Sequence, residues 1–163
     1  LDSLQTFATV GVLAVSCGDE VNYVNANFIA KEKGIDLTTS EFSNHSGYQN
    51  KVSINITTPT GVKTISGTVF NEDVQRIVEI NGFPLDIEPK GKMIIMRNHD
   101  VPGVIGEVGK ILGNNNINIA DFRLSRGKDG ALAVILIDEK ACSDVLKKLD
   151  SLEAAIAVAY AEI

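Results

Sequence analysis

The fold of this 163-residue chain is decided by residues 93–137, MIIMRNHDVPGVIGEVGKILGNNNINIADFRLSRGKDGALAVILI. Residues 93–97 form a short apolar run that is typical of a buried strand. Apolar residues then recur at helical spacing over 104–112, and Gly113 with three asparagines ends this predicted helix. Two strands are expected at 117–124 and 131–137, joined by a turn at 126–130.

The residues after this stretch complete a regular plan. A helix is predicted at 141–149 and a last strand at 155–163, which gives the order βαββαβ. This is the split βαβ arrangement of a ferredoxin-like fold. Such a fold leaves one sheet face and an edge strand available to a partner, so the pattern predicts a dimer.

The first half of the chain is predicted to mix helices and hairpins. Residues 4–13 are apolar enough for a buried helix or a buried strand, and periodicity does not separate the two. A helical pattern over 21–34 ends at Gly34, and 35–42 resemble a strand. Two hairpins follow, the first turning at 59–61 and the second at Asn81-Gly82, a pair that favours a type I′ turn.

A short linker separates the two halves. Pro89 and Gly91 lie within 88–92, between two periodic segments. We therefore predict an α/β (α+β) protein of two small domains, residues 1–90 and the ferredoxin-like residues 91–163.

Composition excludes several classes of function. Hydrophobic residues make up 44% and charged residues 22% of the chain, which is ordinary for a globular protein and not for a disordered one. The net charge of −6 argues against nucleic acid as a partner, and no apolar run is long enough for a membrane span. Cys17 and Cys142 form no disulfide framework, so we expect a reducing cytoplasm and two cysteines packed as small apolar residues.

Residues for catalysis or metal binding are scarce. The two histidines, His45 and His99, are both expected in loops and lack the spacing of a zinc site, so no metal is predicted. The glycines at 103, 106 and 109 lack the strand-GxGxxG-helix form of a dinucleotide site. No complete active site is visible, which favours a binding role over catalysis.

The loop at 98–103 is the most promising binding element. It leads into a helix whose first amides are free and whose positive end suits a carboxylate. Asp100 could pair with an ammonium group, and Asn98 could donate and accept hydrogen bonds, so the loop matches a free α-amino acid. The alternative is turn chemistry, with Asp100 capping the helix, Pro102 presetting it and Gly103 relieving crowding. Residue types alone favour this alternative somewhat.

Two family resemblances change that weighting. The stretch 98–106 (NHDVPGVIG), followed by 116–120 (NINIA) and 123–126 (RLSR), resembles an ACT domain, a small βαββαβ module that binds amino acids. Residues 21–34, 66–70 (SGTVF) and 76–83 (RIVEINGF) resemble the intervening domain of long-form D-3-phosphoglycerate dehydrogenases. Together the resemblances cover nearly the whole chain and imply the regulatory part of an enzyme whose catalytic and NAD-binding domains would precede it.

The resemblance implies an effector site between paired ACT domains. In this family L-serine, the end product of the pathway, binds there and lowers activity. Asn98 and Asp100 of one subunit would contact the ligand, Asp100 at its ammonium group, and Asn118 would reach it from the partner. The amides near Val101, Gly103 and Val104 would hold the carboxylate. L-serine or a similar small amino acid is thus the expected ligand, in a homodimer through ACT domains and a tetramer in the parent.

A second effector site is expected to be weak or missing. The intervening domain of some relatives carries a basic cluster that binds anionic substrate or phosphate. Here only Arg76 falls on that cluster, while Pro84 and Glu88 occupy other parts of it. Two other parents stay open on sequence alone, the regulatory region of an iron–sulfur L-serine dehydratase and a stand-alone amino-acid-binding ACT protein. No cofactor is expected in these residues, and NAD is expected in the parent enzyme.

Overall fold

The structure is a computed structural model that describes residues 1–163 except 43–46, 49 and 72. The chain forms two compact units, residues 1–47 and 48–163. This border between compact units does not coincide with the linker at 88–92, and the domain border expected there stays a prediction. Among the described helices, none combines the length and the hydropathy that a membrane span requires.

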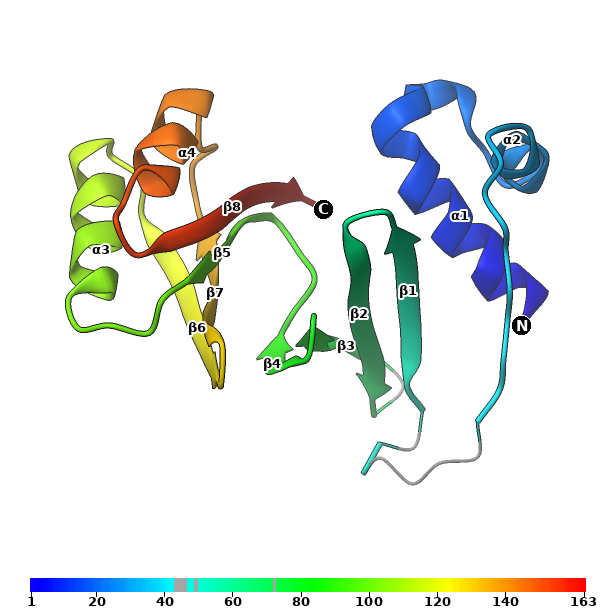
Figure 1. The fold of residues 1–163 in the computed structure, drawn as a ribbon, viewed down its shortest axis with the longest axis horizontal. Coiled ribbons are helices and arrows are strands. Elements are labelled where there is room, and N and C mark those ends of the chain that lie inside the picture. Colours follow the sequence, from blue (N-terminus) through cyan, green and yellow to red (C-terminus); the bar gives the residue numbers. More distant parts are fainter. Residues whose placement is uncertain (43–46, 49, 72) are drawn as a thin grey trace. The chain divides into compact units, whose positions relative to one another are not determined.

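The first unit consists of helices (Figure 1). Helix α1 spans Asp2–Cys17, a 3-10 turn η1 spans Gly18–Glu20, and α2 spans Ala26–Glu32. Leu13 on α1 packs with Val21 and with Ala26 and Ala30 on α2. Residues 4–13, left open between helix and strand, are therefore helical, because one face of α1 is buried against α2.

The strand predicted at 35–42 is wrong, because the structure has no regular element there. The helical pattern before it ends as expected, since Gly34 has a φ of 70° and its amide donates to the Lys31 carbonyl. Residues 35–42 are all exposed, and none of the described strands pairs with them. A strand needs a hydrogen-bonded neighbour, which local sequence does not supply. The loop expected around His45 lies mostly outside the described residues.

The second unit begins with a four-stranded antiparallel sheet in the order β1-β2-β3-β4. Its strands span Val52–Thr58, Gly61–Phe70, Val74–Ile80 and Phe83–Ile87. Both predicted hairpins are present. Asn81 and Gly82 have φ values of 50° and 82°, the left-handed conformation that a type I′ turn requires at both positions.

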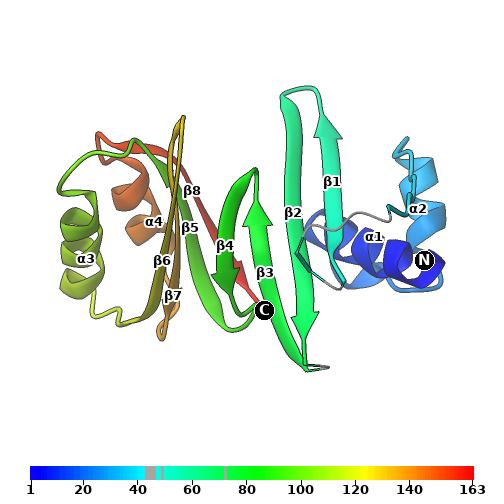
Figure 2. The same ribbon diagram turned by 90° about the horizontal axis from the view of Figure 1, so that it is seen from below.

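The rest of the second unit has the predicted ferredoxin-like plan. Strand β5 spans Lys92–Asn98, α3 Val104–Asn114, β6 Ile119–Gly127, β7 Gly130–Ile137, α4 Ser143–Asp150 and β8 Ala155–Glu162. The sheet order is β6-β7-β5-β8, with every neighbouring pair antiparallel. Helices α3 and α4 lie on one side of it (Figure 2), where Ile94, Met96, Val108, Leu112 and Leu149 form the core.

The other face of this sheet differs from expectation, because it is not left open. Ile77, Ile80, Phe83 and Ile87 of β3 and β4 pack against it in a second core, which includes Met93, Leu132 and Val134. Strand β4 contacts both β6 and β7. Burial of these apolar side chains favours covering the face, at roughly 25 cal/mol per Å². The outer strands β6 and β8 form the two edges of this sheet.

Candidate functional site

A cavity of about 170 Å³ lies where β5 ends and α3 begins, beside β6. Five of the six residues expected to bind an amino acid line it: Asn98, Asp100, Val101, Gly103 and Val104. The other lining residues are mainly apolar, among them Met96, Phe122 and Leu124. A mostly apolar cavity with a few convergent polar groups is the usual form of a small-molecule site.

Asn98 carries an unsatisfied acceptor into this region. The residue is only 3% exposed, although asparagine is usually a surface residue. Its Nδ2 donates to the His99 carbonyl at 2.7 Å, while Oδ1 is buried without a partner among the described residues. A buried acceptor without a donor costs roughly 1–3 kcal/mol. A ligand that donates a hydrogen bond would remove that cost.

Asp100 does not cap helix α3, so the capping alternative is wrong. The N-cap is Gly103, with a φ of 95°, and no side chain caps the helix. Asp100 Oδ2 instead accepts from Nε of Arg126 at 2.6 Å, across from the end of β6. The Asp100 side chain is 33% exposed and that of Arg126 is 71% exposed. The Asp100 carboxylate is therefore partly open to solvent at the cavity, and it forms an ion pair with the largely exposed Arg126.

The start of α3 supplies amide donors. The first bond of the helix runs from the Glu107 amide to the Gly103 carbonyl at 3.0 Å, so the amides of Val104, Ile105 and Gly106 precede the helical ladder. Val101 differs, because its amide donates to the His99 carbonyl at 3.0 Å. A carboxylate in the cavity would thus meet the amides of residues 104–106, at the positive end of the helix.

Asn118 does not line the cavity of its own chain. It lies exposed just before β6, where its Nδ2 donates to Asp138 Oδ2 at 2.6 Å and its amide donates to Glu139 Oε2 at 2.7 Å. Its expected contact with a ligand would have to come from a second subunit, and that contact stays a prediction.

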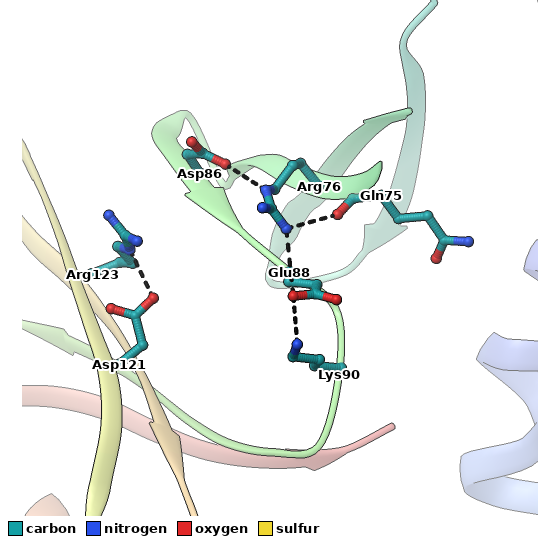
Figure 3. Close-up of polar contacts among 7 residues, drawn as sticks. All are labelled: Gln75, Arg76, Asp86, Glu88, Lys90, Asp121 and Arg123. Carbon is teal, nitrogen blue, oxygen red and sulfur yellow. Dashed lines mark hydrogen bonds and ion pairs between the residues drawn. The ribbon is translucent and has the colours of Figure 1, made fainter. Parts of the chain in front are cut away.

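Arg76 is neutralised by carboxylates (Figure 3). Its Nε lies 3.1 Å from Asp86 Oδ1 and its Nη1 lies 3.7 Å from Glu88 Oε2, while Glu88 also pairs with Lys90 at 2.7 Å. The hydrogen bond from Lys90, opposed by partial burial and aided by the charges of Lys90 and Arg76, lowers the pKa of Glu88. Two carboxylates at one guanidinium leave little net attraction for an anion.

Potential metal ligands are dispersed over the described residues. No cluster of three histidine, cysteine, aspartate or glutamate side chains occurs there. His45 lies outside the described residues. Neighbouring strands of the second unit pair antiparallel, whereas the dinucleotide-binding fold is built on a mostly parallel sheet. Both cysteines are free; Cys17 is half-buried, but Cys142 is exposed and does not pack as an apolar residue as expected.

Two residues of the site are missed by reasoning from sequence. Arg126 ends the RLSR motif, but only the register of β6 with β7 and the loop at 98–103 bring it to Asp100. Gly130 has a φ of 112°, and a Cβ there would lie 2.5 Å from the Asn98 carbonyl oxygen. A glycine in a turn is typical of a left-handed backbone or of a close backbone approach, but the sequence does not show which residue approaches.

Comparison with known proteins covers most of the chain. Residues 1–81 match the family model of the D-3-phosphoglycerate dehydrogenase intervening domain, and residues 92–154 match that of the ACT domain. A D-3-phosphoglycerate dehydrogenase of Bacillus subtilis (strain 168) is 39% identical over 78% of this chain and 24% of its own length. One of Archaeoglobus fulgidus is 31% identical over 94% of this chain and 30% of its own length. The chain thus spans less than a third of the length of these relatives.

Proposed function

Because this chain belongs to the D-3-phosphoglycerate dehydrogenase family, as its intervening and ACT domains, we propose that it is the regulatory part of such an enzyme. The ACT domain would bind L-serine, the end product, for feedback inhibition. One observation carries the proposal: the cavity joins an exposed carboxylate, a buried unsatisfied acceptor and a free helix N-terminus. Those three groups complement the two charges and the hydrogen-bond donors of a small amino acid.

Each ligand group has a partner of suitable chemistry. The ammonium of L-serine would pair with Asp100 and donate to Oδ1 of Asn98. Its carboxylate would accept from the amides of residues 104–106. A volume of about 170 Å³ suits a small ligand rather than a large side chain, which supports L-serine or glycine over aromatic amino acids.

A second copy of the chain would complete the site. Asn118 lies beside the outer strand β6, outside the cavity of its own chain. We propose a homodimer through ACT domains in which Asn118 of the partner subunit contacts the ligand, and a tetramer in the parent enzyme. A ligand held by both copies would favour one arrangement of the pair, and only unequal affinity for two arrangements can transmit inhibition.

The parent would be an NAD-dependent dehydrogenase of the cytoplasm, with its nucleotide site outside these residues. The names of the relatives support this enzyme over an L-serine dehydratase. The intervening-domain match over residues 1–81 argues against a stand-alone ACT protein.

Calorimetric titration of L-serine into this chain tests the proposal. We expect saturable binding that weakens at least about tenfold in Asp100→Ala, because a charge-assisted hydrogen bond is lost. Asn118→Ala should weaken binding as well, and only where the protein is dimeric. Asp121→Ala is the matched control, since this carboxylate pairs with Arg123 at 2.9 Å outside the cavity.

The possible outcomes test separately whether L-serine binds, where it binds and whether the partner subunit contributes. Absence of binding in a verified dimer would refute the serine site. Binding that survives Asp100→Ala as well as it survives Asp121→Ala would place the ligand elsewhere. Retained binding in Asn118→Ala dimers would refute the contribution of the partner subunit.

A further inference from the structure

A second cavity lies on the opposite face of β5, under the β3–β4 hairpin. Successive side chains of a strand point to opposite faces, so Asn98 lines the cavity on the helix side and Arg97 lines this one. Its volume is about 180 Å³, close to that of the first cavity. Residues from both four-stranded sheets line it, among them Lys63 of β2, Phe83 of β4 and Ala159 of β8.

The cavity exists because the hairpin does not cover the whole sheet. Strand β4 packs on β6 and β7, while the β8 side presents alanines at 157 and 159, both exposed. Alanine side chains are too short to fill the space beside Phe83 and Ile80. A concave, mostly apolar recess therefore remains between the two sheets.

The polar lining of this recess is cationic. Lys63 and Arg97 contribute two positive charges, Asn81 contributes an amide, and no carboxylate is among the described lining residues. Arg76 is different, because Asp86 and Glu88 neutralise it. Two cations beside apolar walls attract an anion more strongly than the same charges in open solvent.

Arg97 is held in place but not satisfied. Its guanidinium lies over the Phe83 ring, 5.3 Å from the ring centroid, and Nη2 donates to the Asp129 carbonyl at 3.2 Å. Nε is buried and has no acceptor among the described residues. A buried charged donor without an acceptor is unfavourable, and a carboxylate matches the planar fork of arginine.

We propose that this recess binds the carboxylate of a small organic acid, with Arg97 and Lys63 as its charged partners. The acid's short carbon chain would lie against Ile95, Leu132 and the alanines of β8. An apolar lining favours a carboxylate with a hydrocarbon body over inorganic phosphate, which has no apolar surface and loses more hydration on burial. This site is separate from the proposed L-serine site and does not depend on it.

Titration of the isotopically labelled chain with sodium propionate, followed by the amide resonances of Ala157 and Ala159, tests the site. Sodium chloride at equal ionic strength controls for screening, and sodium phosphate is the competing oxyanion. We expect saturable shifts with propionate, weakened at least about tenfold in Arg97→Gln, since a charged hydrogen-bonding partner is removed. Arg123→Gln is the matched control, because it removes the same charge from an ion pair outside the recess.

A second variant keeps the test decisive if Arg97→Gln does not fold. Ala159→Leu leaves both cations in place and fills the recess from the exposed β8 strand, so it should abolish the propionate shift of the remaining reporter, the Ala157 amide. Shifts that sodium chloride reproduces, or that persist unchanged in Ala159→Leu, would overturn the proposal. Saturable phosphate binding as tight as that of propionate would overturn the choice of a carboxylate.

Discussion

Asn98 and Arg97 are neighbours on β5, yet they line two different cavities, one with groups of both charges and one with cations. The helix-side cavity combines the carboxylate of Asp100 with the positive end of α3, so it suits a ligand that carries both charges. The hairpin-side recess has two cations and no carboxylate among its described lining residues, so it suits an anion. The two polar residues differ in burial too, since Asn98 is 3% exposed and Arg97 is only half-buried.

The difference shows how one strand end can support two sites. Because side chains alternate along a strand, Arg97 and Asn98 point to opposite faces of the sheet. The turn between β6 and β7 nevertheless contacts both residues. The carbonyl of Asp129 accepts from Arg97, and Gly130 lies against the carbonyl of Asn98. Changes in this turn should therefore affect both cavities, whereas changes in the lining residues should affect only one.

The largest effect is expected from Gly130→Ala. Its φ of 112° is unfavourable for alanine, and the new Cβ would lie 2.5 Å from the Asn98 carbonyl oxygen. We expect the free energy of unfolding to fall by about 2–4 kcal/mol, from backbone strain together with a backbone clash. L-serine and propionate binding should both weaken.

Gly109→Ala is the control for Gly130→Ala. Gly109 lies inside α3, and outside the backbone of that helix no described atom comes within 4 Å of where an alanine Cβ would lie. Alanine there should therefore stabilise the chain by about 0.5–1 kcal/mol. Denaturant unfolding of both variants measures these values. Equal stability of Gly130→Ala and the unsubstituted chain would contradict the strain and the clash at this turn. Loss of only one of the two ligands in Gly130→Ala would contradict the link between the two cavities.

Most of the fold follows from local sequence. Periodicities of two and 3.6 residues predict every element of the βαββαβ half. In the sheet before it, the backbone preference of Asn81-Gly82 is enough to predict the β3–β4 hairpin. The strand expected at 35–42 fails because the tendency to be extended does not supply a pairing partner. The packing of β3 and β4 against the β6-β7-β5-β8 sheet also depends on tertiary contacts. The local sequence of these two strands does not specify those contacts.

The site follows from sequence only in part. The loop at 98–103 is visible because a strand, a Pro-Gly turn and a helix meet there in order. The Asp100–Arg126 pair joins residues 26 positions apart, so it depends on the register of β6 against β7. In the sequence, Arg97 is only a polar residue at the end of an apolar strand. The recess around it forms because the β3–β4 hairpin packs over this part of the sheet.

A smaller effect is expected from Arg126→Gln, which sharpens the charge assignment of the helix-side cavity. Without Arg126 the carboxylate of Asp100 is no longer balanced, so the cavity should favour a cation over a zwitterion. We expect the affinity for L-serinamide relative to L-serine to rise about two- to fivefold, the range of an exposed ion pair. Calorimetry at low salt measures the ratio, and added salt should reduce the change.

Arg123→Gln is the matched control for this ratio. It removes the same charge from the same strand, but its partner Asp121 does not line the cavity. An equal rise in both variants would mean that net charge, and not the Asp100–Arg126 pair, sets the preference. Propionate binding on the hairpin side should be unchanged in either variant.

The smallest effect concerns the neutralised arginine, Arg76, and its carboxylate Glu88. Hydrogen bonding from Lys90 is the main cause that holds the pKa of Glu88 below its ordinary value of 4.5. A carboxyl group with a lowered pKa in the folded state stabilises it above pH 4.5, and this contribution is lost as the pH falls through the lowered pKa. The melting temperature of Glu88→Gln should therefore lie slightly below that of the parent chain at pH 7, and the gap should close in acid.

Glu153→Gln separates this effect from a general loss of charge, because Glu153 is exposed and belongs to none of the ion pairs in the described residues. Its melting temperature at pH 7 should stay close to that of the unsubstituted chain, because no ion pair is lost. If Glu88→Gln lowers the melting temperature by the same amount at pH 7 and in acid, the lowered pKa of Glu88 would be contradicted.

Phosphate binding tests the neutralisation of Arg76. An arginine paired with two carboxylates should leave an anion little net attraction, so phosphate binding at neutral pH that is lost in Arg76→Ala would contradict this neutralisation.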